Sequence, residues 1–265
     1  MLDSESQAER SAATNPGTTK AGATNRAGSA EAESSRPWVR YAWAAGIVYV
    51  VALVAEIVVA LGVGLTANDS AGKIARGLTE HHTRLLVITY LSAVYAIAFL
   101  IYLSSLCNLL RGDSDRPRIL GSLVLVGGVL FITLHAVSDI GITGLVGAKL
   151  ASFGSQHAHG LSYTLYLMTY ALESVGDVFG SLCFFAAGLL VLRSGVLPRW
   201  LGYVSILAGI LLFLQAFGLG GVIASFGLVL DGIGFVLALL FVLVSSVILL
   251  RRESPVPPHG VVLNR

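Results

Sequence analysis

The sequence predicts an all-α polytopic membrane protein, a bundle of about six transmembrane helices with both termini cytoplasmic. Hydrophobic residues make up 55% of the chain and charged residues only 12%, and mean hydropathy is +0.80. Soluble domains do not have this balance. The net charge of +2, without a basic run, excludes a nucleic-acid-binding surface as the main function. The lipid bilayer is therefore the first predicted partner.

The domain organisation follows from where apolar periodicity begins and ends. Residues 1–36 are rich in Ala, Ser, Thr, Gly, Asn and Glu and have no apolar period, so we expect a disordered cytoplasmic tail. The first long apolar run begins near Tyr41 and is too long for a signal peptide. A six-helix transmembrane domain is predicted over 37–252 and a short cytoplasmic tail over 253–265.

Several apolar stretches are long enough to cross a hydrocarbon core of about 30 Å at a rise of about 1.5 Å per residue. The last two are separated only by a Gly-rich turn around Gly220 and Gly221, so residues 215–235 can be divided between them in more than one way. The predicted spans lie near 41–65, 85–110, 119–146, 165–192, 199–222 and 226–250.

The distribution of Lys and Arg predicts the orientation, because cytoplasmic connections retain positive charge. With the N-terminus inside, the outer flanks carry only Lys73, Arg76, Arg84 and Lys149. The inner flanks carry Arg36, Arg40, Arg111, Arg116, Arg118, Arg193, Arg199, Arg251 and Arg252.

The starts of two predicted spans share a weak sequence repeat. PRILG at 117–121 and PRWLG at 198–202 each open a span with proline in the first turn, and each is followed by another glycine seven residues on. One interpretation is a pair of duplicated helical hairpins, as in transporters. The alternative is that interfacial arginine and helix-starting proline recur in membrane proteins generally.

The segment LRSGVLPRWLG at 192–202, followed by LAG at 207–209, resembles a bacterial family of six-helix membrane proteins catalogued only as a domain of unknown function. The similarity lies in an arginine-serine turn, a leucine-proline-arginine helix start and small residues in the next helix. The loop over 69–84, with a short helix leading into the second span, is also similar. The resemblance implies a shared fold over most of 40–250, a bacterial inner-membrane location and no established activity.

Ionisable side chains inside the predicted spans indicate a functional or structural role, because placing each one in lipid costs a free energy of a few kcal/mol or more. The depth of each polar residue in the membrane follows from its distance along the helix from the cytoplasmic arginine of that helix. By this count the residues form two groups, the first at a depth of about 24 Å and the second at about 30 Å. Tyr90 and Tyr95 span both depths. The candidate polar cluster comprises Glu56, His135 and Asp177 at the first depth, together with Gln215, and Asp139, Glu173 and Asp231 at the second.

Spacing within two antiparallel spans predicts how these groups pair. His135 and Asp139 are four residues apart, as are Glu173 and Asp177, so each pair lies on one helix face. We therefore expect His135 opposite Asp177 and Asp139 opposite Glu173. The alternative is that the charges are scattered at the outer interface or serve only as structural hydrogen-bonding groups.

A cluster of this kind needs compensation, because its carboxylates cannot all ionise together in low dielectric without protons or a cation. A small ligand or ion is a conceivable partner, although the chain has no metal motif such as HExxH and no cofactor motif. The two cysteines, Cys107 and Cys183, share no CxxC spacing and are expected to be packing residues.

Three functions remain open at this point. The favoured one is a small transporter or ligand-binding membrane protein that uses the cluster in the outer half of the bundle, although the inner half is almost purely apolar. The second is a membrane-embedded enzyme, metal-dependent or using His135 and a carboxylate as acid and base. The third is a non-catalytic membrane component that binds a partner or lipid.

Overall fold

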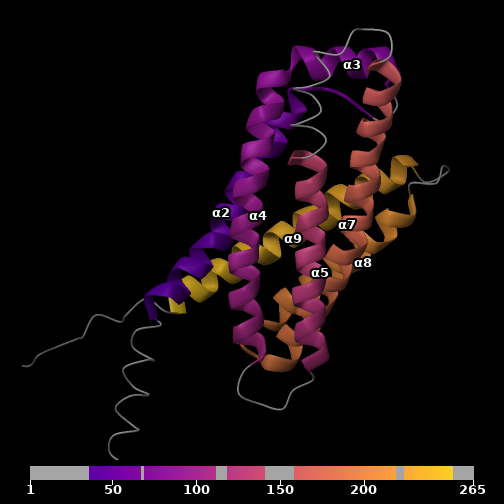
Figure 1. The fold of residues 1–265 in the computed structure, drawn as a ribbon. Coiled ribbons are helices and arrows are strands. Elements are labelled where there is room, and N and C mark those ends of the chain that lie inside the picture. Colours follow the sequence, from indigo (N-terminus) through magenta and orange to yellow (C-terminus); the bar gives the residue numbers. More distant parts are fainter. Residues whose placement is uncertain (1–35, 67–68, 112–117, 141–157, 219–223, 253–265) are drawn as a thin grey trace, which may run out of the picture. The chain divides into compact units, whose positions relative to one another are not determined.

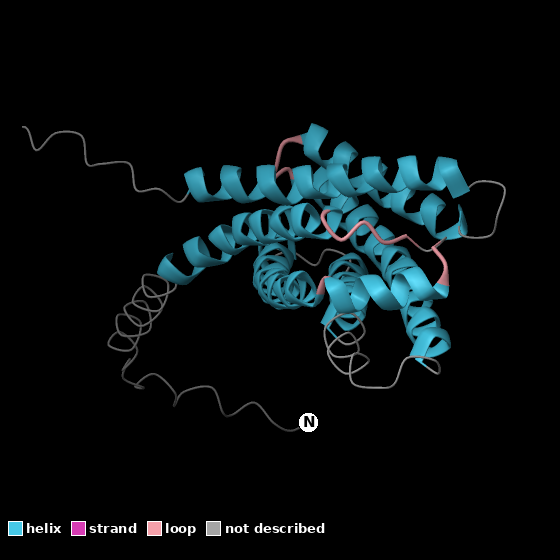
Figure 2. Cartoon of the chain, turned by 90° about the horizontal axis from the view of Figure 1, so that it is seen from above, coloured by secondary structure: helices cyan, strands magenta, loops and turns pink. Residues whose placement is uncertain are grey.

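The computed structural model describes residues 36–66, 69–111, 118–140, 158–218 and 224–252. Residues from Arg40 onward form one compact unit, and residues 1–39 form a separate one. The predicted tails therefore lie almost entirely outside the described residues. Within the described part all regular structure is helical (Figure 2).

The helices confirm the predicted fold class. Five of them are long and apolar enough to cross a membrane, and a sixth apolar stretch, Arg199–Gln215, is shorter. The count agrees approximately with six spans. The helices are α2 (Arg36–Leu61), α3 (Ala71–Glu80), α4 (His82–Arg111), α5 (Arg118–Ala136), α7 (Ala158–Ser194), α8 (Arg199–Gly218) and α9 (Ala224–Arg252).

The surface of the compact unit is apolar. Large aliphatic side chains such as Val58 and Ile97 are more than 60% exposed. Aromatic side chains such as Trp43 and Phe99 lie inside instead. Contiguous exposed apolar surface on several long helices indicates that lipid is the surrounding solvent.

Helix α7 packs against both α5 and α8, and α8 in turn packs against α9, while α4 packs against α5 (Figure 1). Helix α2 meets α4 through aromatic rings: Tyr49 and Phe99 have centroids 4.9 Å apart, and Trp43 meets Tyr102 edge to face at 6.3 Å. The aromatic rings thus lie on the sides of α2 and α4 that face each other.

A glycine allows α7 and α8 to approach closely. A Cβ at Gly188 would lie 2.6 Å from the carbonyl oxygen of Gly202 and 2.9 Å from the backbone nitrogen of Ile206. Both neighbours are backbone atoms, so neither can move without moving α8. Small residues at such crossings are how membrane helices associate tightly.

The turn between α7 and α8 has a definite local geometry. Gly195 follows the last residue of α7 with φ +65°, a left-handed conformation that glycine adopts without strain. The hydroxyl of Ser194 accepts a hydrogen bond from the Val196 N–H, and Arg252 of α9 donates to the Val196 carbonyl. The arginine-serine turn is thus held by the end of α9.

The short helix α3 lies across the ends of α4 and α7 (Figure 1). Ser70 is its N-cap and accepts from the Lys73 N–H. Its apolar face buries Ile74 and Leu78 against Leu85 of α4. A short helix before the second span was expected, and α3 confirms it.

Asp69, in the loop before α3, should make the docking of this helix depend on pH. The Lys73 ammonium donates to Asp69 at 2.7 Å and the Thr66 N–H donates at 2.9 Å, and these bonds hold the pKa of Asp69 below its usual value. Their stabilisation is present at neutral pH and is lost as the pH falls through that lowered pKa, below about 4. Asp69→Asn should remove this acid-side loss, measured as hydrogen-exchange protection factors of α3. Equal acid dependence in both proteins would contradict it.

Both cysteines are buried, and within the described part of the chain neither is joined in a disulfide. Cys107 lies 3.9 Å from the Gly121 carbonyl oxygen, between α4 and α5. A Cβ on Gly128 would meet the sulfur of Cys183 at 3.1 Å, so this thiol fills the contact between α5 and α7. The two side chains are packing residues.

Candidate functional site

The centre of the site is Ser92 of α4, which is fully buried. Its Oγ lies 3.3 Å from Oε1 of Glu56 on α2 and 3.2 Å from Oδ2 of Asp139, just beyond α5. The same atom is 2.9 Å from the carbonyl oxygen of Ile88. One hydroxyl therefore faces three acceptor oxygens from three segments.

Hydrogen counting shows what this junction requires. A serine hydroxyl has one hydrogen to donate, and the carbonyl of Ile88 can only accept. Donation to Ile88 leaves both carboxyl groups beside a lone pair of Ser92, unless one of them is protonated and donates to it. Two ionised carboxylates around one buried hydroxyl would also repel in low dielectric. The junction is consistent only when it holds a proton or a bound cation.

The two carboxyl groups differ in their remaining partners. Tyr95, one turn further along α4, donates its phenol hydrogen to Oδ2 of Asp139 at 2.7 Å. Oε2 of Glu56 is buried and has no hydrogen-bond partner among the described residues. Only 8% of Glu56 is exposed, so bulk solvent hardly reaches that side chain. Glu56 is therefore the less satisfied member of the pair.

A π-type turn over 137–140 extends α5 and sets the direction of two adjacent side chains. Asp139 faces α4, as above, while Ser138 faces α7 and donates to Oε1 of Glu173 at 2.8 Å. Asp139 lies against the hydroxyls of Ser92 and Tyr95, and Glu173 against that of Ser138; the predicted contact between Asp139 and Glu173 stays a prediction. The wider turn changes which residues share a face.

The second contact joins α5, α7 and α8. His135 Nδ1 lies 2.9 Å from the Phe131 carbonyl oxygen, which can only accept, so Nδ1 carries a hydrogen. The other nitrogen, Nε2, lies 3.5 Å from Oδ1 of Asp177. The amide of Gln215 donates to Oδ2 of Asp177 at 3.1 Å. His135 and Asp177 thus face each other as the spacing predicted, and they are placed to share one proton.

The structure brings most of the predicted residues together, but some of them pair differently from what their predicted membrane depths indicated. Glu56 contacts Ser92, which also contacts Asp139, and does not join His135, because α2 packs on α4. Helix tilt also changes the membrane depths that were counted from the arginines. Tyr90 is 73% exposed and lies outside the network. The side chain of Asp231 lies outside the described residues.

Two members of the network, Ser92 and Ser138, were not predicted. Each is fully buried in an apolar span and bonds to a carboxyl group of another helix. The available signal was position: Ser92 is three residues from Tyr95, and Ser138 adjoins Asp139. Neither hydroxyl is ionisable, so charge inside the apolar spans does not mark these two residues.

Metal binding finds no support in the donor arrangement. Among the described residues no group of three or more His, Cys, Asp or Glu side chains is placed to hold a metal ion. The carboxyl groups instead pair with hydroxyl, amide and imidazole groups, one or two at a time.

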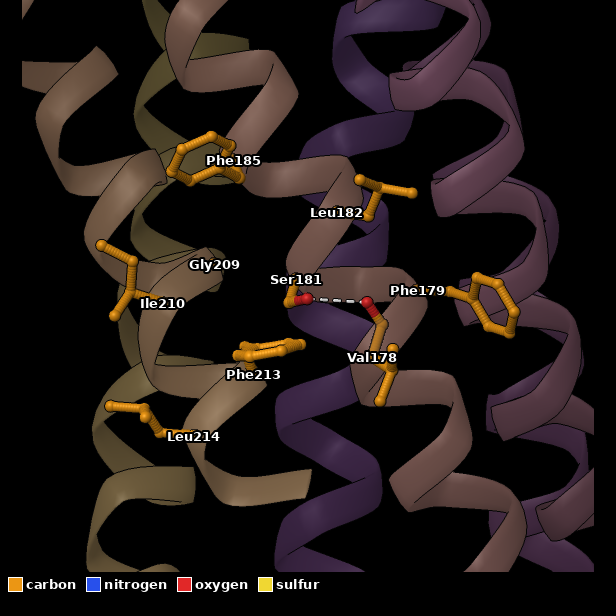
Figure 3. A pocket seen from close by; sticks show the side chains of 9 residues that line it. All are labelled: Val178, Phe179, Ser181, Leu182, Phe185, Gly209, Ile210, Phe213 and Leu214. Carbon is orange, nitrogen blue, oxygen red and sulfur yellow. Dashed lines mark hydrogen bonds between the residues drawn. The ribbon is translucent and has the colours of Figure 1, made fainter. Parts of the chain in front are cut away.

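An apolar groove of about 380 Å³ lies between α7 and α8, apart from the network (Figure 3). The hydroxyl of Ser181 is its main polar group, and it donates to the Val178 carbonyl at 2.7 Å. The groove therefore offers apolar contact only. Its lining residues are Val178, Phe179, Ser181, Leu182, Phe185, Gly209, Ile210, Phe213 and Leu214.

The helices, their apolar exterior and the enclosed polar network define a multi-pass α-helical membrane protein in a lipid bilayer. The family model described as "Domain of unknown function (DUF4386)" matches residues 44–250, and the chain belongs to this family. No curated protein and no solved structure matches the chain. The predicted relationship to a family of unknown function is confirmed, and the family carries no activity over to this chain.

Proposed function

We propose that the chain is a small proton transporter that binds the transported proton at Glu56, Ser92 and Asp139. The proposal includes a plasma-membrane location in a bacterial cell, with both termini cytoplasmic. The observation that carries it is the junction at Ser92, where two buried carboxyl groups flank one hydroxyl. Intramembrane carboxyl groups in such positions are typical of proton relays.

The remaining network supports the same role. From Asp139 the polar groups continue through the adjacent Ser138 to Glu173, and one turn further along α7 to Asp177 and His135. The contacts of Ser138 with Glu173 and of His135 with Asp177 each join groups that can hold or release a hydrogen. A purely structural role would be served more simply by fully paired side chains, whereas Oε2 of Glu56 has no described partner.

The test combines infrared spectroscopy with proton flux. The purified protein should show the carbonyl stretch of a protonated carboxylic acid at neutral pH, and Glu56→Gln and Asp139→Asn should reduce it. In liposomes with a pH gradient and a clamped membrane potential, the wild type should admit protons faster than protein-free vesicles. Each substitution should lower this flux by about tenfold or more, because a proton-binding step is removed.

Glu80→Gln is the matched control, since it makes the same change at an exposed position of α3. It should leave both the infrared band and the flux unchanged. The proposal is wrong if the wild type shows no protonated carboxyl group, or if its proton flux equals that of protein-free liposomes. A band that persists without any flux would also contradict the transport function and leave a static, structural proton.

A further inference from the structure

The short helix α3 closes an apolar cluster at one end of the bundle. The buried members of the cluster are Ile74 and Leu78 of α3 and Leu85 and Ile88 of α4, each at most 6% exposed. Together with the side chains that pack against them they form the α3 plug. The packed side chains come from α2, the loop after it and α7, and they are Val59, Val63, Leu65, Tyr163 and Tyr166.

The α3 plug lies next to the proton-binding junction on both α2 and α4. On α4, Leu85 and Ile88 precede Ser92 by seven and four residues, so the three share one helix face. On α2, Val59 follows Glu56 by three residues and shares its face. Helix α2 ends and α4 begins at the connection that carries α3. On both helices the plug residues are therefore on the α3 side of the junction.

The plug is also continuous with the rest of the polar network. The carbonyl oxygen of Ile88, a plug residue, lies 2.9 Å from Oγ of Ser92. On α7, Tyr166 of the plug precedes Glu173 by seven residues, which places it two turns closer to α3 on the same helix face. Glu173 accepts from Ser138 at 2.8 Å. The plug therefore adjoins the network on α4 and on α7.

Helix α3 is held in place mainly by these apolar contacts. It has only 10 residues, and the hydrogen bonds of its side chains among the described residues stay local. The Lys73 ammonium donates to Asp69 in the preceding loop, and the Thr79 hydroxyl donates to the Ala75 carbonyl within the helix. A short helix docked by a few apolar side chains opens at a lower free energy than the long helices of a bundle.

We infer that α3 is the gate of the proton-binding site. While α3 is docked, the plug keeps water away from Glu56, Ser92 and Asp139, and displacement of α3 admits water to them. The four buried side chains of the plug are aliphatic and offer water no hydrogen-bond partner, so the docked plug does not conduct protons. The inference rests on the proposed function and names the regulation of the same site.

Ile74→Ala tests the gate, because it removes most of a fully buried plug side chain and weakens the docking of α3. The infrared carbonyl band of the protonated carboxyl pair shifts when deuterium from heavy water replaces its proton. The rate of this shift in the purified protein measures how often water reaches the pair. Exchange should be slow in the wild type and faster by about tenfold or more in Ile74→Ala. The band before exchange should be the same in both proteins.

Two further variants are the controls. Ile74→Val keeps most of the side chain and should exchange more slowly than Ile74→Ala. Ile97→Ala makes the same change on α4 at a position that is 62% exposed, away from the plug. It should exchange at the rate of the wild type.

The outcomes separate the gate from the proposed function. If the wild type transports protons but exchanges at the same rate as Ile74→Ala, the gate is wrong and the proposed function stands. Exchange in the wild type that is complete within the mixing time would also overturn the gate, since the docked plug would not exclude water. A loss of the band in Ile74→Ala would show that α3 holds the carboxyl pair in place, and would overturn the gate as well. If the wild type has no protonated carboxyl group, the proposed function fails and the inference fails with it.

Discussion

Gly188→Leu should lower the free energy of unfolding by about 3 kcal/mol, because the added side chain meets backbone atoms of α8 and cannot be accommodated by a rotamer change. The nearest of these, the Gly202 carbonyl oxygen, would lie only 2.6 Å from a Cβ at this position. Reversible unfolding in detergent, followed by circular dichroism, measures the change. Infrared bands and flux should be lost only to the extent that the protein unfolds.

The control for this substitution lies in the same helix. A Cβ at Gly160, near the start of α7, would have no neighbour within 4 Å. Gly160→Leu should therefore change the stability by no more than about 0.5 kcal/mol. Equal stabilities of the two variants would show that α7 and α8 do not pack as closely as the structure has them.

Asp177→Asn and His135→Gln should each destabilise the protein by about 1–3 kcal/mol, because each weakens the buried contact between the two side chains. The double variant should cost less than the sum of the two, by about 0.5–3 kcal/mol, since the second change acts on a contact that the first has already weakened. The contact of His135 Nε2 with Asp177 Oδ1 at 3.5 Å is the basis. Unfolding free energies of the four proteins of the cycle measure it.

An independent pair gives the reference for that cycle. His135→Gln and Asp69→Asn change residues that take part in separate groups of contacts, the network and the loop before α3. Their effects should add to within about 0.5 kcal/mol. If the His135 and Asp177 substitutions also add, the two side chains share no proton and the second contact of the network is only proximity.

The length and hydropathy of the apolar stretches were sufficient to predict the fold class, because lipid admits few alternatives to a bundle of long helices. Helix α8 starts at Arg199, in agreement with a span predicted near 199–222 that opens at the PRWLG segment. The outer end of α8 was harder to place, because Gly-rich sequence gives no period there. The predicted orientation and the two tails stay predictions.

The candidate site was predictable where regular helix geometry holds. His135 and Asp177 face each other because both lie in regular turns of antiparallel helices. The π-type turn at 137–140 has no obvious sequence signature, so the direction of Asp139 could not be counted. The hydroxyl of Ser92 was passed over because serine is common in apolar helices and carries no charge.

The burial of both thiols has a practical consequence for chemistry on this protein. Cys107 and Cys183 are each 2% exposed, so a water-soluble maleimide has almost nothing to react with on the native chain. Cysteines introduced one at a time at the ends of the helices can then be labelled without first removing the native pair. Because the native cysteines give little background labelling, the unmodified protein can be used directly to map which side of the bilayer each helix end occupies.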